Sequence, residues 1–395
     1  MYKDEVNQAI IKAQREHSPS FSMKTKLYSV FVVLALIGGA HTALAQPTLG
    51  ITPAGKQLLL FWPSNATSYV LQSLTNLAST NWVFATDAAP ATYGSQIAVT
   101  VTNTSAARFF RLIAMPPSVP AGMALIPAGS FTMGDTLDSE TDAIPTSVYV
   151  SGFYMDTNLV SYSQWQTIYN WATNNGYGFD DLGSGKAANQ PVQMVNWFDC
   201  VAWCNARSQQ AAGLTPCYYT DAGFTQVYTN ATGTNVYVNM ANNGYRLPTE
   251  AEWEKAARGG LSGQRFPWGD TISESQANYY GQTTSYSYDL GPNGYNTNFD
   301  SGALPYTSPV GSFAANGYGL NDMAGNVFEW CWDWYGTPYG QPTNTNPTGP
   351  ATGSFRMLRG GSWNGPAGDA RCAFRGSSDP DYAYDFFGFR CVRGL

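Results

Sequence analysis

Histidine is almost absent from this chain of 395 residues. The two histidines, His17 and His41, both stand before Gln46, where a processed form of the chain is predicted to begin. A processed chain without imidazole has no Ser-His-Asp or Cys-His nucleophile system, no histidine-ligated zinc or copper, and no two-histidine iron site. Any chemistry must therefore rest on carboxylates, tyrosine, lysine, arginine or cysteine.

Charged residues are also scarce, at 12% of the chain, and the net charge is −7. A chain this acidic offers no electrostatic surface for nucleic acid or for an anionic membrane, so we expect neither as a partner. The sequence is rich instead in glycine (40), proline (23), tyrosine (25) and tryptophan (12). This composition is typical of irregular loops packed by large aromatic side chains.

The N-terminal segment has the pattern of a secretory signal peptide. Two lysines precede an apolar run at 27–40, and small residues at 43–45 form a cleavage signal. The run is too short to span a membrane comfortably, so an uncleaved anchor is the weaker interpretation. Residues 1–45 are predicted to be leader and signal peptide, cleaved near Ala45. The mature chain, without a transmembrane segment, would be secreted, periplasmic or at the cell surface.

Residues 46–115 are predicted to form a small all-β sandwich. Short runs of β-branched and aromatic residues alternate with turn residues. These runs lie at 57–62, 68–71, 81–84, 96–101 and 108–112. The spacing of Trp62, Tyr69 and Trp82 resembles fibronectin type III modules. We favour a spacer over an independent binding module, followed by a stiff proline-rich linker at 116–122.

Beyond the linker, the pattern predicts few helices and much loop. One helix is expected to begin near Asn196 and to run through Cys204. A second is expected from Thr249, where residues 249–252 form a capping box ahead of an apolar run. A weaker helical pattern covers 163–172. Residues 123–395 are therefore expected to be a loop-rich α+β domain.

Eight motifs follow one another in this domain. They are MALIPAGSFTMG at 123–134, VNW at 195–197 with AWC at 202–204, RLPTEAEWE at 246–254, FPWG at 266–269, NGYGL at 316–320, GNVFEW at 325–330, RGGSW at 359–363 and GFRC at 388–391. In this order and over this length they resemble the formylglycine-generating (sulfatase-modifying factor) family. The resemblance implies a C-type-lectin-like fold over 123–395.

The resemblance also exposes a difference in chemistry. Members of this family oxidise a cysteine of a sulfatase peptide to formylglycine, using oxygen and a copper(I) ion held by two thiolates, the soft ligands that this ion prefers. Those cysteines belong three and eight residues after the serine of the Gly-Gly-Ser motif, which is Ser362 here. Gly365 occupies the first position, and residues 364–370 contain no sulfur. We therefore expect no bound copper and assign no catalytic residue.

Calcium is a further implication of the resemblance, because family members hold it through backbone carbonyls and a few carboxylates or amides. Two sites map onto this chain: Asp322, Gly325, Val327 and Glu329 form the first, and Asn278, Tyr279 and Asp300 form the second. The calcium would be structural. The alternative for Asp322 and Glu329 is ordinary turn capping and loop hydrogen bonding.

The family's substrate groove lies beside the Gly-Gly-Ser loop. The residues that would line it here are Ser362, Trp363, Arg375, Phe328 and Asp379. Aromatic and arginine side chains anchor a peptide, protein or glycan ligand well, because they bury a large area at low entropic cost. The alternative is that individual aromatic residues fill the core of a loop-rich fold.

All six cysteines lie between Cys200 and Cys391. In an exported chain they are predicted to form disulfides, although spacing alone does not choose the pairing. The family resemblance implies a Cys204–Cys391 pair. It also marks Cys372 as a disulfide cysteine whose usual partner position is occupied here by Ala257. The remaining candidate pairs are Cys331 with Cys372, and Cys200 with Cys217. Alternatively, Cys331 and Cys372 stay reduced and bind a metal.

Two classes of function remain. The first is an exported, non-catalytic protein that binds a peptide, protein or glycan. The closing segment resembles that of variable ligand-binding proteins diversified by retroelements, but it lacks an asparagine-rich run. The second is a family oxidoreductase that matures exported sulfatases or performs another oxidation. The missing sulfur favours the first.

Overall fold

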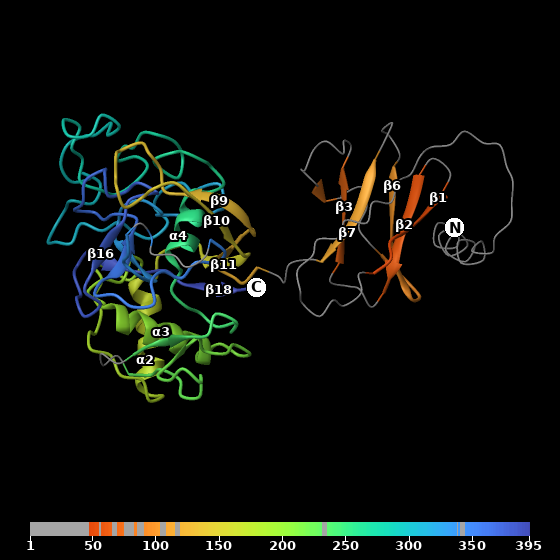
Figure 1. The fold of residues 1–395 in the computed structure, drawn as a ribbon, viewed down its shortest axis with the longest axis horizontal. Helices are drawn as coiled ribbons and strands as arrows, with labels where there is room; N and C mark the ends of the chain where they lie inside the picture. The colour runs from red at the N-terminus through yellow and green to blue at the C-terminus, as the bar shows by residue number, and fades with distance from the viewer. Residues whose placement is uncertain are drawn as a thin grey trace, which may run out of the picture. The chain divides into compact units, whose positions relative to one another are not determined.

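The structure is a computed structural model, and it describes residues 47–54, 57–64, 69–74, 83–84, 91–102, 108–114, 119–230, 235–337, 339 and 344–395. The chain divides into two compact units, Met1–Ser118 and Val119–Leu395 (Figure 1). The second unit begins inside the predicted linker. The predicted signal peptide lies outside the described residues. No helix within the described ranges has the length and apolar character needed to cross a membrane.

The first unit contains two antiparallel sheets. Their strands are β1 (Gly50–Ala54), β2 (Gln57–Pro63), β3 (Tyr69–Leu74), β4 (Val83–Phe84), β5 (Ala91–Tyr93), β6 (Gln96–Thr102) and β7 (Phe109–Ala114). The strand orders are β1-β2-β6-β5 and β4-β3-β7. A strand coincides with each of the five runs predicted from sequence, although residues 68 and 81–82 of those runs lie outside the described residues. The sequence pattern did not predict β1, which contains Gly50 and Pro53, or β5, which has three residues.

One hydrophobic cluster connects these two sheets. Leu60, Trp62 and Val99 belong to the four-stranded sheet, and Leu71 and Phe110 belong to the three-stranded sheet. Leu60 and Trp62 are two residues apart, so the alternation of a strand turns both side chains to the same face. The two sheets therefore share one core.

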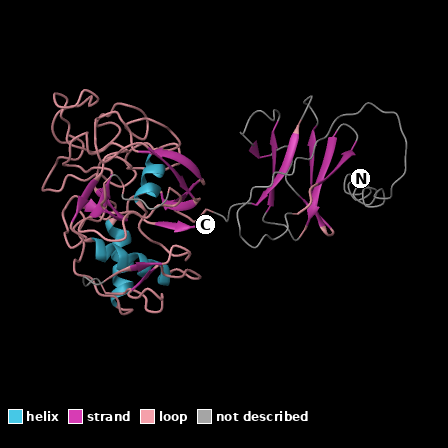
Figure 2. Ribbon diagram, viewed as in Figure 1, coloured by secondary structure: helices cyan, strands magenta, loops and turns pink. Residues whose placement is uncertain are grey.

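The second unit is mostly loop, with short strands and three helices among its described residues (Figure 2). The strands are β8 (Met123–Ile126), β9 (Gly129–Met133), β10 (Thr146–Val150), β11 (Phe153–Asp156), β12 (Tyr218–Tyr219), β13 (Tyr237–Val238), β14 (Phe328–Trp334), β15 (Arg356–Arg359), β16 (Gly376–Ser378), β17 (Phe387–Gly388) and β18 (Val392–Gly394). They form sheets in the orders β10-β9, β18-β11-β8, β12-β13 and β16-β15-β14-β17. This is a loop-rich α+β arrangement.

The three predicted helices are present, and each begins at a side-chain cap, of which the sequence predicted the one at Thr249. Helix α2 (Tyr162–Thr173) follows Ser161, and α3 (Trp197–Gln210) follows Asn196. Helix α4 (Glu250–Ala257) follows Thr249, and Glu252 completes the capping box. These caps satisfy backbone N–H groups that have no partner within the helix.

Aromatic packing joins α2 and α3. The rings of Trp165 and Trp203 stack at 5.9 Å, and Phe389 meets both edge-on at 6.1 and 5.2 Å. These residues belong to a large buried cluster, while α4 contributes Trp253 to a second cluster. With little regular structure, the unit depends on such ring contacts for much of its core.

Candidate functional site

The loop after β15 is the region where the family resemblance placed the site. Gly361 has a positive φ of 74°, and a Cβ there would lie 2.9 Å from backbone atoms, so glycine is required. The Trp363 N–H donates to the Asn326 carbonyl at 2.8 Å, and the Tyr280 N–H donates to the Gly365 carbonyl at 2.8 Å. Backbone hydrogen bonds from two other segments therefore fix the path of this loop.

This loop presents oxygen atoms where the family has thiolates. The Ser362 hydroxyl donates to Asn364 Oδ1 at 2.8 Å. A Cβ added to Gly365 would lie 3.0 Å from the carboxylate of Asp369, whose pKa burial raises to about 6. Copper(I) prefers soft sulfur ligands to such hard oxygen donors. The residues present do not fit a two-thiolate copper site.

None of the six cysteines belongs to the loop 362–370, and all six are buried. The sulfur atoms of Cys204 and Cys391 are 3.5 Å apart, so the structure brings this predicted pair together. The other two predicted pairs each share a hydrophobic cluster, Cys331 with Cys372 and Cys200 with Cys217. Burial raises the pKa of Cys372 to about 12, which disfavours the thiolate that a metal would need.

An aromatic cluster surrounds the loop. The Trp363 ring lies 5.7 Å from the rings of Tyr295 and Tyr306, and Tyr295 lies 4.8 Å from Tyr280. Trp363 is buried, whereas the three tyrosines are only half-buried. The ammonium of Lys186 lies 5.1 Å from the centre of the Tyr306 ring. We call Trp363, Tyr280, Tyr295 and Tyr306 the aromatic cluster.

Exposed aromatic residues adjoin this cluster. The Trp363 indole N–H donates to the Asp385 carbonyl at 3.2 Å. Next to Asp385 stands Tyr384, 42% exposed, and its ring stacks on Phe386 at 5.2 Å. Tyr382 is 52% exposed and meets Tyr384 edge-on. The sequence interpretation missed all these residues except Trp363, although the tyrosine-rich run at 279–306 was an available signal.

The predicted groove residues do not form one exposed surface. Ser362 and Trp363 are 1% and 3% exposed. Phe328 is half-buried between Phe374 and Phe387. The half-exposed Asp379 accepts a hydrogen bond from the Asp381 N–H at 3.1 Å. Of the predicted groove residues, Trp363 therefore remains part of the candidate site, as the buried member of the aromatic cluster.

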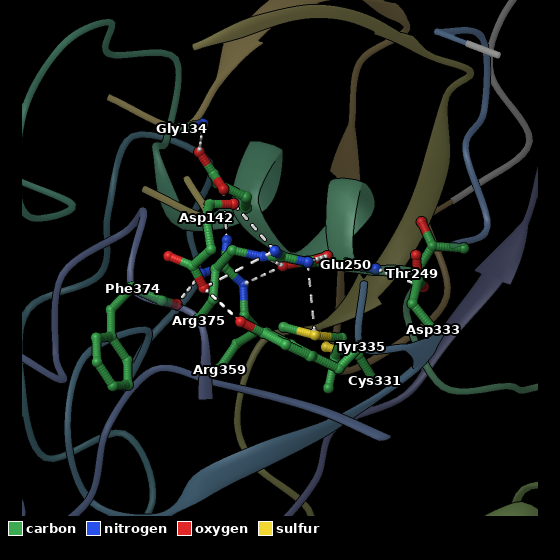
Figure 3. A network of polar contacts seen from close by, with 12 residues as sticks. Gly134, Asp142, Thr249, Glu250, Cys331, Asp333, Tyr335, Arg359, Phe374 and Arg375 are labelled. Atoms are coloured by element: carbon green, nitrogen blue, oxygen red, sulfur yellow. Dashed lines mark hydrogen bonds and ion pairs between the residues drawn. The ribbon is translucent and has the colours of Figure 1, made fainter. Parts of the chain in front are cut away.

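Arg375 is placed differently from the prediction. Its guanidinium donates to both carboxylate oxygens of Glu250 at 2.6 and 2.9 Å, and also to the carbonyls of Asp142 and Gly336. Figure 3 shows Arg375 between Asp142 and Glu250, beside Arg359. Its side chain is fully buried and its donors are occupied in the core, so in this structure Arg375 packs inside the domain and presents no donor at the surface, in contrast to the role predicted for it.

The first predicted calcium site retains one suitable carboxylate. Asp322 Oδ2 accepts from the Gly311 N–H at 2.6 Å, while Oδ1 is buried without a partner. Burial raises the Asp322 pKa to about 6. Asp322 also lines a cavity of about 10 Å³, which has room for one water molecule or ion. A bound cation would satisfy the unpaired oxygen.

Glu329 does not fit the same role. Both of its carboxylate oxygens accept from Arg390, at 2.7 and 2.9 Å, and the pair is buried. Because Arg390 already neutralises this carboxylate, the structure favours a core ion pair for Glu329, and its calcium role stays a prediction. Gly325 and Val327 would offer backbone carbonyls alone.

The polar side chains of the second predicted calcium set have other partners or face solvent. The Tyr279 hydroxyl donates to Asp289 at 2.5 Å, and the Asn278 amide donates to the Tyr306 carbonyl at 2.8 Å. Asp300 is exposed. Across the residues that the structure describes, no three side chains of the His, Cys, Asp and Glu types are grouped as a metal site. Side-chain ligands alone therefore do not make a calcium site here.

Comparison with known proteins identifies the family. Residues 111–395 match the family described as Sulfatase-modifying factor enzyme 1-like domain. The chain belongs to this formylglycine-generating, or sulfatase-modifying factor, family. It is 32% identical to the formylglycine-generating enzyme of Thermomonospora curvata, over 70% of this chain and 95% of that protein. The predicted family is confirmed.

Relatives in this family carry different names. The protein named serine/threonine-protein kinase pkn1 of Chlamydia caviae is 42% identical over 38% of this chain, and the alignment spans only 21% of that protein. The solved structure of Treponema denticola variable protein 1 has a TM-score of 0.53 and 28% identity, covering 69% of this chain and 95% of that one. Family membership therefore establishes the domain but not the activity.

Proposed function

We propose that this chain is an exported ligand-binding member of its family that takes a peptide, protein or glycan at the aromatic cluster. The observation that carries the proposal is the loop from Ser362 to Ala370, which has oxygen donors and no sulfur. Without two thiolates the family's oxidation has no copper ligands. The same loop holds Trp363 against the half-buried rings of Tyr295 and Tyr306.

The chemistry of the cluster suits such a ligand. Tyrosine offers a rigid apolar face and a hydroxyl group that both donates and accepts hydrogen bonds. Rings of this kind stack against sugar faces or peptide side chains with little loss of conformational entropy. The adjoining Tyr384 and Tyr382 extend the exposed aromatic area. The alternative, an oxidoreductase that matures exported sulfatases, requires the missing thiolates.

Tyr384→Ala should weaken binding at least tenfold, because it removes an exposed ring beside the cluster. The measurement is to screen glycan and peptide arrays with the purified chain and then to titrate the strongest binder. Tyr237→Ala is the matched control, since Tyr237 is 37% exposed in β13 and Tyr384 is 42% exposed. The proposal fails if no class of ligand binds, or if Tyr384→Ala and Tyr295→Ala both leave the affinity unchanged.

We further propose that Asp322 binds a structural calcium ion together with backbone carbonyls. The support is the buried Oδ1 atom without a partner. Calcium at a hundred times its Kd would stabilise the fold by about 2.7 kcal/mol, and each kcal/mol raises Tm by roughly 2–4 °C. Calcium should therefore raise Tm measurably above its value in EDTA.

Asp322→Asn should abolish this calcium-dependent rise, measured by thermal unfolding with and without EDTA. Asp381→Asn, at an exposed position, is the control and should keep the rise. The same Tm with calcium and with EDTA in the unaltered protein would rule out the structural ion.

The remaining proposals concern the N-terminal part. We propose that residues 1–45 are removed on export and that 46–115 is a fibronectin-like β-sandwich acting as a spacer. The shared core of its two sheets supports the sandwich. N-terminal sequencing of the exported protein should begin at Gln46, whereas an intact leader on the exported protein would contradict this processing.

A further inference from the structure

A cavity of about 370 Å³ lies between the β9–β10 strand pair and the C-terminal end of α4. None of the predicted groove or calcium residues lines it. The lining residues that matter here are Ser130, Thr132, Ser147, Lys255, Ser262 and Tyr318. Most carry hydroxyl groups, and one carries a positive charge.

Strand geometry explains why hydroxyl groups of β9 and β10 face the cavity. Thr132 of β9 pairs with Ser147 of β10 in the antiparallel ladder, and both side chains are exposed. Because side chains alternate along a strand, Met133 and Val148 turn to the opposite face and enter the core. The outward face of this strand pair therefore presents hydrogen-bonding groups to the cavity.

Lys255 supplies the charge. It is only 4% exposed, and its ammonium donates to the carbonyls of Gly129 at 2.8 Å and Val150 at 3.3 Å. Within the part of the chain that the structure describes, no carboxylate pairs with it. Burial lowers the Lys255 pKa, and no acidic neighbour opposes this shift. A buried ammonium held by carbonyls alone is costly unless an anion completes its environment.

The neighbouring acid does not supply that anion. Glu254, the residue before Lys255, is buried and paired with both Arg258 and Arg359. Two guanidinium groups thus share one carboxylate there, and Arg258 itself reaches the cavity wall. Arg359 also lies 3.7 Å from Glu250, so the arginines at this end of α4 face carboxylates, whereas carbonyls alone hold Lys255.

We infer that this cavity is a binding site for a small ligand bearing an oxyanion, with the anionic group at Lys255 and hydroxyl partners at Thr132 and Ser147. The ligand chemistry is a carboxylate or sulfate group, either as a free ion or on a sugar. The inference does not depend on the function proposed for the aromatic cluster.

Isothermal titration calorimetry of the full mature chain tests the inference, with sodium sulfate, glucuronate and uncharged glucose as probes. We expect both anions to bind and glucose to bind at least tenfold more weakly. Tighter binding of glucuronate than of sulfate would assign the site to an anionic sugar, and equal binding would assign it to the oxyanion itself.

Two variants locate the binding. Lys255→Met keeps the aliphatic part of the side chain but removes its charge, and it should weaken the binding of both anions at least tenfold. Because it changes a buried residue, Ser147→Trp provides a second test from an exposed position and should block the cavity. Ser377→Trp, on an exposed serine of β16, is the matched control and should bind normally. Absence of anion binding, or unchanged binding in Ser147→Trp, would overturn the inference.

Discussion

Replacing Glu254 with alanine should lower the free energy of unfolding by about 3–5 kcal/mol, the usual cost of breaking a buried ion pair by removing one partner. Glu254 is fully buried and accepts from Arg258 at 2.7 and 2.9 Å, from Arg359, and from the Gly134 N–H at 2.7 Å. Its loss would leave two buried guanidinium groups without their shared carboxylate. Arg359 would keep Glu250 at 3.7 Å, whereas Arg258 would lose the carboxylate to which it donates, so the deletion leaves one buried charge uncompensated as well as a small cavity.

Denaturant unfolding of the C-terminal transition measures this effect. Asp381→Ala removes an exposed carboxylate and should change stability by no more than about 0.5 kcal/mol. A loss below about 1 kcal/mol for Glu254→Ala would show that this carboxylate does not hold the core together.

The exported protein should contain a disulfide between Cys204 and Cys391. Their sulfur atoms lie 3.5 Å apart, and the bond would tie α3 to the segment before β18. In the chain-entropy model, closing a loop longer than a hundred residues stabilises by about 5 kcal/mol. Reduction should lower the unfolding free energy by an amount of this order.

Mass spectrometry of non-reduced peptides detects the bond, and unfolding with and without reductant measures its contribution. Cys204→Ser should reproduce the effect of reduction on this bond, and adding reductant to that variant should cause a smaller further loss. Alkylation of Cys204 and Cys391 in the denatured, unreduced protein would contradict the prediction.

Local signals made the helices predictable. Thr249 and Glu252 stand three residues apart, and the capping box they form depends on almost nothing beyond those residues. Asn196 caps α3 through Asp199 in the same way. Motifs spread along the chain likewise identified the family, because their order is visible without the fold.

Sequence reasoning fell short where the environment of a side chain depends on a distant partner. Arg375 and Glu250 are 125 residues apart, and Arg390 and Glu329 are 61 apart. Both pairs are buried, so these motif residues hold the core together, although the sequence interpretation assigned two of them to ligand-binding roles. Charge and residue type alone do not distinguish these two roles.

The aromatic cluster and the cavity at Lys255 could not be predicted from sequence for the same reason. The aromatic cluster joins tyrosines at 280, 295 and 306 to Trp363, a contact that only the folded loops create. Lys255 acquires its buried position through carbonyls that are 126 and 105 residues away. The sequence shows the density of tyrosine and the presence of a lysine, but not what encloses them.

The most direct test of the central claim is the conversion of a Cys-x-Pro-x-Arg peptide, incubated with the copper-loaded, reduced protein and oxygen and followed by mass spectrometry. A formylglycine-generating relative such as that of Thermomonospora curvata serves as the positive control. We predict no formylglycine beyond the amount formed without protein, because the loop around Gly365 has no thiolate. Repeated turnover to formylglycine by this chain would contradict the ligand-binding account.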